Sequence, residues 1–304
     1  MRAILLRRLA TAVPTLFAVV LLSFVLMRAA PGSPFDGERP LDAATRAALD
    51  RAYGLDRPVV EQLGRYLARI AHGDFGPSLV YKDFTVSQLI AQGLPVSLTL
   101  GGLALLLAAL LGVSGGIVAA QHPDRWSGRA IDTAAAIAIA LPGFVTGPLL
   151  ALVFALWLAW LPVSGLDGAA SLVLPVVALA FPVAGAVARL TRSGLSEVLA
   201  REHIRMARAR GLSPRAILFR HALPPALIPV VSYLGPAAAG LLTGAVVIET
   251  VFGLPGLGRY FVQGALNRDY PLVMGVVVLY AVLILAFNLL ADLLYGWLDP
   301  RVRG

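Results

Sequence analysis

The chain has 304 residues, of which 58% are hydrophobic and only 14% charged, with a net charge of +8 and a mean hydropathy of +0.81. These values exclude an ordinary soluble domain and indicate a polytopic membrane protein, and the basic charge favours anionic lipid and acidic protein faces over nucleic acid. The chain contains no cysteine, so disulfides, thiolate metal sites and cysteine nucleophiles are excluded.

Six apolar runs are each long enough, at about 20 residues, to cross the hydrocarbon core of a bilayer. They cover residues 9–27, 94–120, 133–160, 169–188, 226–247 and 270–290. An even number of spans places both termini on one side of the membrane. That side carries basic residues next to the spans, which marks it as cytoplasmic: Arg2, Arg7, Arg8, Arg125, Arg129, Arg301 and Arg303.

Residues 1–30 have the basic start and apolar stretch of a secretory signal, but the stretch is too long and Arg28 blocks the cleavage position. An uncleaved first span is therefore predicted, followed by an extracytoplasmic segment over residues 31–93. Within that segment an amphipathic helix is expected from Pro58 to Gly73. Its apolar positions are Val59, Val60, Leu63, Leu67 and Ile70. This face could cover the membrane surface and neighbouring spans, or contact an external partner.

Helix breakers recur within the spans, whereas ionisable residues are missing from the centres of all six runs. The breakers are Pro142, Gly143, Gly147, Pro148, Pro175, Pro182, Pro229, Gly235 and Pro236. Such breaks are tolerated where protein or a water-filled cavity satisfies the backbone, which suits a bundle around a pathway whose lining residues stay unassigned. The missing charges disfavour an ion-coupled carrier, although sodium coupling through carbonyls stays open. Glu249 and Asp292 lie near span ends, where interfacial hydration favours a structural role.

No constellation of catalytic or metal-binding residues is evident. His72, His122, His203 and His221 fall in loops at spacings that form no metal cluster, and Ser114 has no helical histidine partner. The run GLPGLG at residues 253–258 lacks the Lys-Ser/Thr of a phosphate loop and predicts a tight extracytoplasmic turn. We therefore expect a non-enzymatic chain without catalytic, cofactor or metal residues, so any ATP must be hydrolysed by another chain.

A basic segment at about residues 192–225 interrupts the apolar runs. An apolar stripe at near-helical spacing predicts a first helix ending at Gly211; its members are Leu195, Val198, Leu199, Ile204 and Met206. Ser213 then caps a second helix with Pro214 at its first position. That helix is expected to end near Leu223, because Pro224 and Pro225 cannot continue the hydrogen-bond ladder.

Eight arginines lie in or beside this segment, which places it on the cytoplasmic face: Arg189, Arg192, Arg201, Arg205, Arg208, Arg210, Arg215 and Arg220. Charge alone would also fit a simple topogenic loop. Two capped helices exceed what topology requires, so the segment is interpreted as a cytosolic docking element.

The segment resembles the cytoplasmic signature of type I ABC importer permeases of the dipeptide/oligopeptide branch, loosely E-A-A-x3-G-x9-I-x-L-P. The signature aligns with Ala207, Gly211 and Leu223-Pro224, while Arg205, Met206 and His221 depart from it. Five further strings resemble the B-subunit group of the oligopeptide permeases. These are APGSPFDGER (30–39), AHGDFGPS (71–78), YKD (81–83), GLPGLG and ALNRDY (265–270).

The resemblance implies an all-α fold with six transmembrane helices and a partly helical extracytoplasmic segment between the first two. The expected organisation is a first helix within 1–30, the outer segment 31–93, a transmembrane domain 94–296 and a cytoplasmic tail 297–304. It also implies a multi-pass protein of the bacterial inner membrane, paired with a homologous second permease. Two cytosolic ATPases that use ATP and Mg and an extracytoplasmic peptide-binding protein would complete the transporter.

By the same resemblance, the residues that couple the chain to the ATPases would be Ala207, Gly211, Ser213, Pro214, His221 and Leu223. The helix 213–223 would lie in a groove on an ATPase. Oligopeptides are the expected cargo. Dipeptides, glutathione, nickel or another small solute are the alternatives within this class, and an ion-coupled carrier is the less favoured reading outside it.

Overall fold

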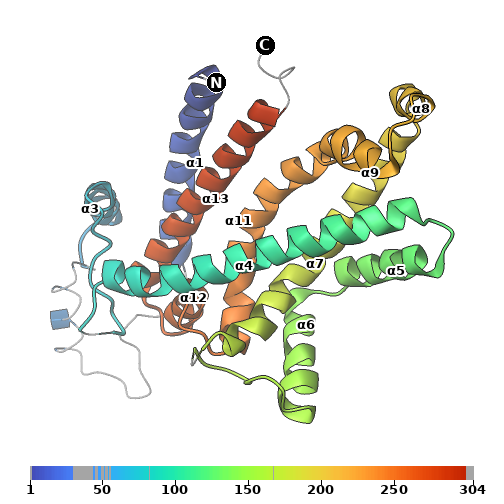
Figure 1. The fold of residues 1–304 in the computed structure, drawn as a ribbon. Coiled ribbons are helices and arrows are strands. Elements are labelled where there is room, and N and C mark those ends of the chain that lie inside the picture. Colours follow the sequence, from blue (N-terminus) through green and yellow to red (C-terminus); the bar gives the residue numbers. More distant parts are fainter. Residues whose placement is uncertain are drawn as a thin grey trace. The chain divides into compact units, whose positions relative to one another are not determined.

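The computed structural model describes residues 2–29, 44, 47–48, 51, 54, 56–81, 83–166 and 168–298 (Figure 1). The string at 30–39 and residues 299–304 of the expected tail lie outside these. The chain divides into two compact units. The first comprises Met1–Leu5, Ser97–Leu254 and Ile284–Gly304, and the second comprises Leu6–Val96 and Pro255–Leu283.

Five helices are long and apolar enough to cross a membrane. They are α1 (Arg2–Ala29), α4 (Val86–Gln121), α7 (Ala170–Leu199), α11 (Ile228–Val251) and α13 (Tyr270–Leu298). A bent pair of helices supplies a sixth span if the pair is counted as one. The predicted all-α membrane fold with six spans is confirmed in this form.

The third expected run, over 133–160, is broken at Pro142 and Gly143, two of the predicted helix breakers. Helix α5 (Trp126–Ala140) ends before Pro142, and α6 (Gly143–Leu150) continues into the π-helical η1 (Ala151–Trp157). The two parts are bent by 109°. Leu141 adopts an extended conformation (φ −84°, ψ 119°), because the ring of a proline disfavours the helical region for the residue before it.

In the first unit, α7 is the central helix and contacts α5, α6 and α11. Glycines allow the closest approaches. A Cβ on Gly116 of α4 would lie 2.5 Å from Cβ of Thr191, and one on Gly185 of α7 would lie 2.7 Å from the carbonyl oxygen of Ala135 in α5. Small residues thus let the helix backbones approach where no hydrophobic force from water drives helices together.

Glu249 in α11 is fully buried, with 0% of its surface exposed, so the expectation of interfacial hydration was wrong. Its Oε1 accepts a hydrogen bond of 2.6 Å from Oγ of Ser97 in α4. The end of α11 is itself buried, because Phe252 and Leu254 pack inside and Leu254 N donates to the Glu249 carbonyl oxygen at 2.8 Å. A buried carboxyl group requires hydrogen-bond partners, and Ser97 supplies one. Asp292 is half-buried in α13.

The second unit contains the predicted amphipathic helix as α3 (Val59–Ala71), preceded by Pro58 and followed by Gly73 in the left-handed region (φ 73°). Val59 and Val60 are exposed, and Leu63, Leu67 and Ile70 are half-buried. The unit also contains an unpredicted short helix, α12 (Leu257–Leu266), after the GLPGLG turn. A Cβ on Gly93 of α4 would lie 3.0 Å from the backbone nitrogen of Leu257, so α12 packs directly on α4.

Asp269 joins two of the strings noted above within the second unit. The residue is fully buried and precedes α13. Its Oδ2 accepts a hydrogen bond from Oγ of Ser78. The same oxygen accepts from the backbone N–H groups of Leu79 and Val80, and each of these two bonds is 3.1 Å long. Its Oδ1 accepts from Leu272 N at 3.2 Å. One carboxylate therefore organises both the loop before α4 and the start of α13.

Candidate functional site

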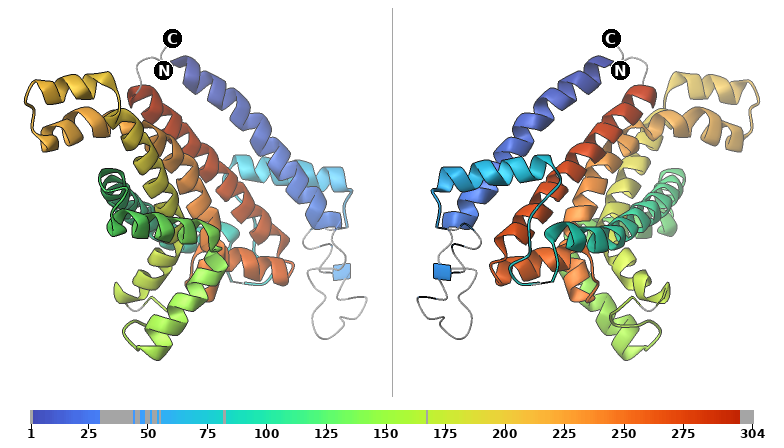
Figure 2. Two further views of the ribbon diagram at one scale, coloured as in Figure 1. Left: turned by 90° about the vertical axis from the view of Figure 1, so that its right-hand side faces the viewer. Right: turned by 90° about the vertical axis from the view of Figure 1, so that its left-hand side faces the viewer.

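The basic segment folds as two short helical stretches that lie side by side, here called the basic hairpin (residues 202–226; Figure 2). The first is α8 (Glu202–Ala209). The second runs through α9 (Pro214–Ala216), the π-helical η2 (Ile217–Ala222) and α10 (Leu223–Ala226). Two capped stretches around a glycine turn, as predicted, make up this hairpin.

The inner face of the basic hairpin is a hydrophobic cluster shared with the end of α7. Its buried members are Leu195, Val198, Ile204, Ile217, Leu218, Ala222 and Ala226, and Ala207 and Leu212 pack against them. A Cβ on Gly194 of α7 would lie 2.7 Å from the carbonyl oxygen of Ala226, so α10 rests directly on α7. Because the hairpin shares a core with α7, a force on it reaches that span.

The turn of the hairpin has the predicted chemistry. Gly211 has φ 78°, in the left-handed region that glycine adopts without strain, and Leu212 N donates to the Ala207 carbonyl oxygen at 3.2 Å. Oγ of Ser213 accepts from Ala216 N at 3.3 Å, and Pro214 occupies the first helical position. The glycine stop, serine cap and N-terminal proline are therefore confirmed as structural elements.

Two local predictions for the hairpin were wrong. The second stretch does not end at Leu223 but continues through Pro224 and Pro225 to Ala226. The prolines lie in the first turn of α10, where the register changes from π to α, so their missing N–H groups interrupt no required bond.

The predicted apolar stripe is also not one helix, since α7 ends at Leu199 and α8 begins at Glu202. Met206 lies outside the cluster, with 56% of its surface exposed. It is two residues from the buried Ile204, which places it on the opposite side of α8.

The outer face of the basic hairpin combines positive charge with apolar side chains. Phe219 is 60% exposed, and Met206 is exposed as well. The exposed arginines of the hairpin include Arg205, Arg208, Arg215 and Arg220. Of the predicted coupling residues, Gly211, Ser213 and Pro214 are exposed at the turn, whereas Ala207, His221 and Leu223 are half-buried. Sequence reasoning missed Phe219, although it lies off the stripe formed by Ile217, Leu218 and Ala222.

An ion pair joins α5 and α7 near the end of α7 that leads into the hairpin. Arg192 of α7 pairs with Asp132 of α5. Both side chains are about one-third exposed, at 37% and 30%. The pair connects the two helices next to the point where α7 enters the hydrophobic cluster.

The first unit also contains a cavity of 510 Å³ lined by α6, α7 and α11. Its lining consists of glycine, alanine, proline and branched aliphatic residues with two aromatic rings. Tyr233 is the only described lining residue with a polar side chain. Three of the predicted helix breakers, Gly143, Pro182 and Pro236, line this cavity, as expected where freed backbone groups require protein or water.

A family model described as "Binding-protein-dependent transport system inner membrane component" matches residues 112–304. The chain is 48% identical over 302 residues to the oligopeptide transport system permease protein OppB of Salmonella typhimurium, with 98% of each chain covered. It is 45% identical over 300 residues to OppB of Haemophilus influenzae, again with 98% of each covered. The dipeptide transport system permease protein DppB of Bacillus subtilis is 40% identical over 289 residues, covering 95% of this chain and 94% of DppB.

Among solved structures, the inward-facing MetNI methionine ABC transporter matches with a TM-score of 0.58 and 19% sequence identity. The match covers 70% of this chain and 97% of that one. An amino acid ABC transporter solved with histidines matches with a TM-score of 0.52 and 20% identity, covering 69% and 94%. These structures support the fold, and the sequence matches identify a multi-pass inner-membrane transport subunit. The chain belongs to the family of binding-protein-dependent transport system inner membrane components.

Proposed function

We propose that this chain is one permease subunit of an ATP-driven oligopeptide importer. The observation that carries the proposal is its identity of 48% and 45%, over almost its whole length, to two permeases named for oligopeptide transport. The dipeptide permease is less similar, at 40%. The match to a binding-protein-dependent transport family also disfavours the ion-coupled carrier.

In this proposal the chain pairs with a homologous second permease, and both its termini are cytoplasmic. Two cytosolic ATPases, which bind ATP and Mg, contact the outer face of the basic hairpin through Phe219, Met206 and the surrounding arginines. A peptide-binding protein delivers cargo from outside. ATP-driven closure of the ATPases moves the hairpin, and the shared hydrophobic cluster carries that movement into α7.

The experiment that tests the function is peptide uptake by the complete transporter, reconstituted in liposomes with its partner subunits and binding protein. We expect accumulation of a labelled oligopeptide that requires ATP and is inhibited by unlabelled oligopeptides. Inhibition by dipeptides, glutathione or nickel instead would reassign the cargo. Accumulation driven by an ion gradient without ATP would overturn the proposal.

We further propose that the 510 Å³ cavity between α6, α7 and α11 is this chain's share of the peptide pathway. A Cβ at Gly240 meets no atom within 4 Å, so Gly240→Phe should extend into the cavity without disturbing the fold. We expect uptake to fall at least about tenfold with unchanged subunit assembly. The matched control is Gly102→Phe, since Gly102 also meets nothing within 4 Å but does not line the cavity. Equal uptake by the two variants would remove the cavity from the pathway.

A further inference from the structure

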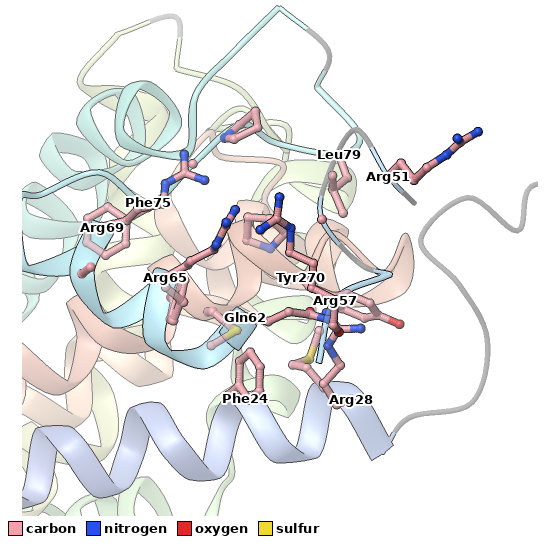
Figure 3. A pocket seen from close by; sticks show the side chains of 18 residues that line it. Phe24, Arg28, Arg51, Arg57, Gln62, Arg65, Arg69, Phe75, Leu79 and Tyr270 are labelled. Carbon is pink, nitrogen blue, oxygen red and sulfur yellow. The ribbon is translucent and has the colours of Figure 1, made fainter. Parts of the chain in front are cut away.

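The second unit contains a cavity of 640 Å³ bounded by α1, α3, the loop at 75–79 and the first turn of α13. Figure 3 shows its lining, with Phe24 and Arg28 contributed by α1 and Arg65 and Arg69 by α3. Five arginines line it: Arg28, Arg51, Arg57, Arg65 and Arg69. The described lining residues include no aspartate or glutamate. A volume of this size accommodates a ligand the size of a lipid headgroup.

Two exposed carboxylates next to the lining, Glu61 and Asp74, pair with three of these arginines. Glu61 accepts from Nη1 of Arg57 at 2.7 Å and pairs with Nη2 of Arg65 at 3.1 Å, and Asp74 accepts from Nε of Arg69 at 2.9 Å. The hydrogen bond from Arg57 lowers the pKa of Glu61, and the one from Arg69 lowers the pKa of Asp74, so both stay ionised at neutral pH. Each guanidinium has five N–H donors, so these pairs leave donors for an anion.

Part of the remaining wall of the cavity is apolar, although Gln62, Tyr66 and Tyr270 also line it. Phe24 and Met274 line it and are largely buried, and the Arg28 guanidinium lies 5.9 Å from the centroid of the Phe24 ring. Farther along α1, Phe17 (52%) and Val13 (68%) are exposed, and at seven and eleven residues before Phe24 they lie on the same face of the helix. Arg28 lies at the end of this span, which places the arginines at the level of the lipid headgroups. An exposed apolar surface of α1 adjoins them.

We propose that this cavity binds the phosphate headgroup of an anionic phospholipid, with its acyl chains along the exposed face of α1. Guanidinium groups suit a phosphate because their paired N–H donors match its oxygens. The adjoining apolar face of α1 favours an amphiphile over a free anion or an acidic protein segment, neither of which would cover it. The bound lipid joins α1 to α3. This inference needs only that α1 is a membrane span, so it stands apart from the identity of the cargo.

The test is native mass spectrometry of the complete transporter, delipidated and titrated with phosphatidylglycerol or with phosphatidylcholine. We expect a retained phosphatidylglycerol adduct, with phosphatidylcholine bound much more weakly. The double variant Arg65→Gln/Arg69→Gln should weaken phosphatidylglycerol binding by about 30-fold. The control Arg125→Gln/Arg129→Gln removes two exposed arginines, one just before α5 and one in its first turn, and should keep the adduct. Subunit stoichiometry in the same spectra reports assembly.

A second double variant keeps the test valid if Arg65→Gln/Arg69→Gln prevents assembly of the transporter. Arg65→Lys/Arg69→Lys keeps the charge but loses the paired donors, so an intermediate loss of binding is expected. Equal binding of the two lipids, or binding unchanged in both double variants, would overturn the proposal. Displacement of the lipid by millimolar inorganic phosphate would show that the arginines accept any free anion. Loss of cross-links to the external binding protein with unchanged lipid adducts would assign the arginines to a protein partner.

Discussion

Replacing Gly211 by valine is expected to reduce ATP-driven peptide uptake at least about tenfold while the chain still inserts and folds. Gly211 is exposed, and a Cβ there would meet nothing within 4 Å, so the substitution creates no clash. The penalty comes from φ 78° alone, because a left-handed conformation costs an L-residue roughly 1–2 kcal/mol. A β-branched residue is the least suited to it. The turn would relax by moving α8 against the second stretch of the basic hairpin.

The matched control for this prediction is Gly211→Asn, because asparagine adopts the left-handed region more readily and should retain most uptake. Gly102→Val adds the same side chain at an exposed glycine of α4 that has no positive φ and should be neutral. Phe219→Ser removes an exposed side chain without changing the turn, and it should reduce ATPase co-purification directly. Wild-type uptake by Gly211→Val would show that the turn does not couple the subunits.

Replacing Asp269 by alanine is expected to destabilise the protein by about 3 kcal/mol or more. The change removes the acceptor of four donors, Ser78 Oγ and the N–H groups of Leu79, Val80 and Leu272. Ser78 and Leu272 are fully buried, and each buried donor left unsatisfied costs about 1–3 kcal/mol. The unfolding midpoint of the detergent-extracted transporter should fall by about 6 °C or more.

The control for the Asp269 prediction is Asn267→Ala. Asn267 is exposed two residues away, just after α12, and among the described residues its side chain donates to Gln263 of that helix. Asp269→Asn should be intermediate, because one amide oxygen can replace only part of the carboxylate. Equal unfolding midpoints for the alanine variants at 267 and 269 would contradict the role assigned to the buried carboxylate.

Features that depend on neighbouring residues could be predicted from the sequence. The amphipathic period and flanking Pro58 and Gly73 define α3, and Gly211 with Ser213 defines the turn of the basic hairpin. The length of each apolar run predicted the spans, because the hydrocarbon thickness sets a minimum helix length. The short strings along the chain placed it in its family. In each case the physical cause acts within a few residues or depends on composition alone.

Other features depend on contacts between residues that are far apart in the chain. Ser78 and Asp269 are 191 positions apart, so nothing local shows that they meet. Burial of Glu249 depends on Ser97 in another helix, and the exposure of Met206 and Phe219 depends on which face of the hairpin α7 covers. The helical path through Pro224 and Pro225 depends on the π-helical register of the residues just before them, which no local sequence signal indicates. Spans, caps, the turn and the family thus follow from residue patterns along the chain, whereas burial and hydrogen-bond partners depend on segments that are brought together only when the chain folds.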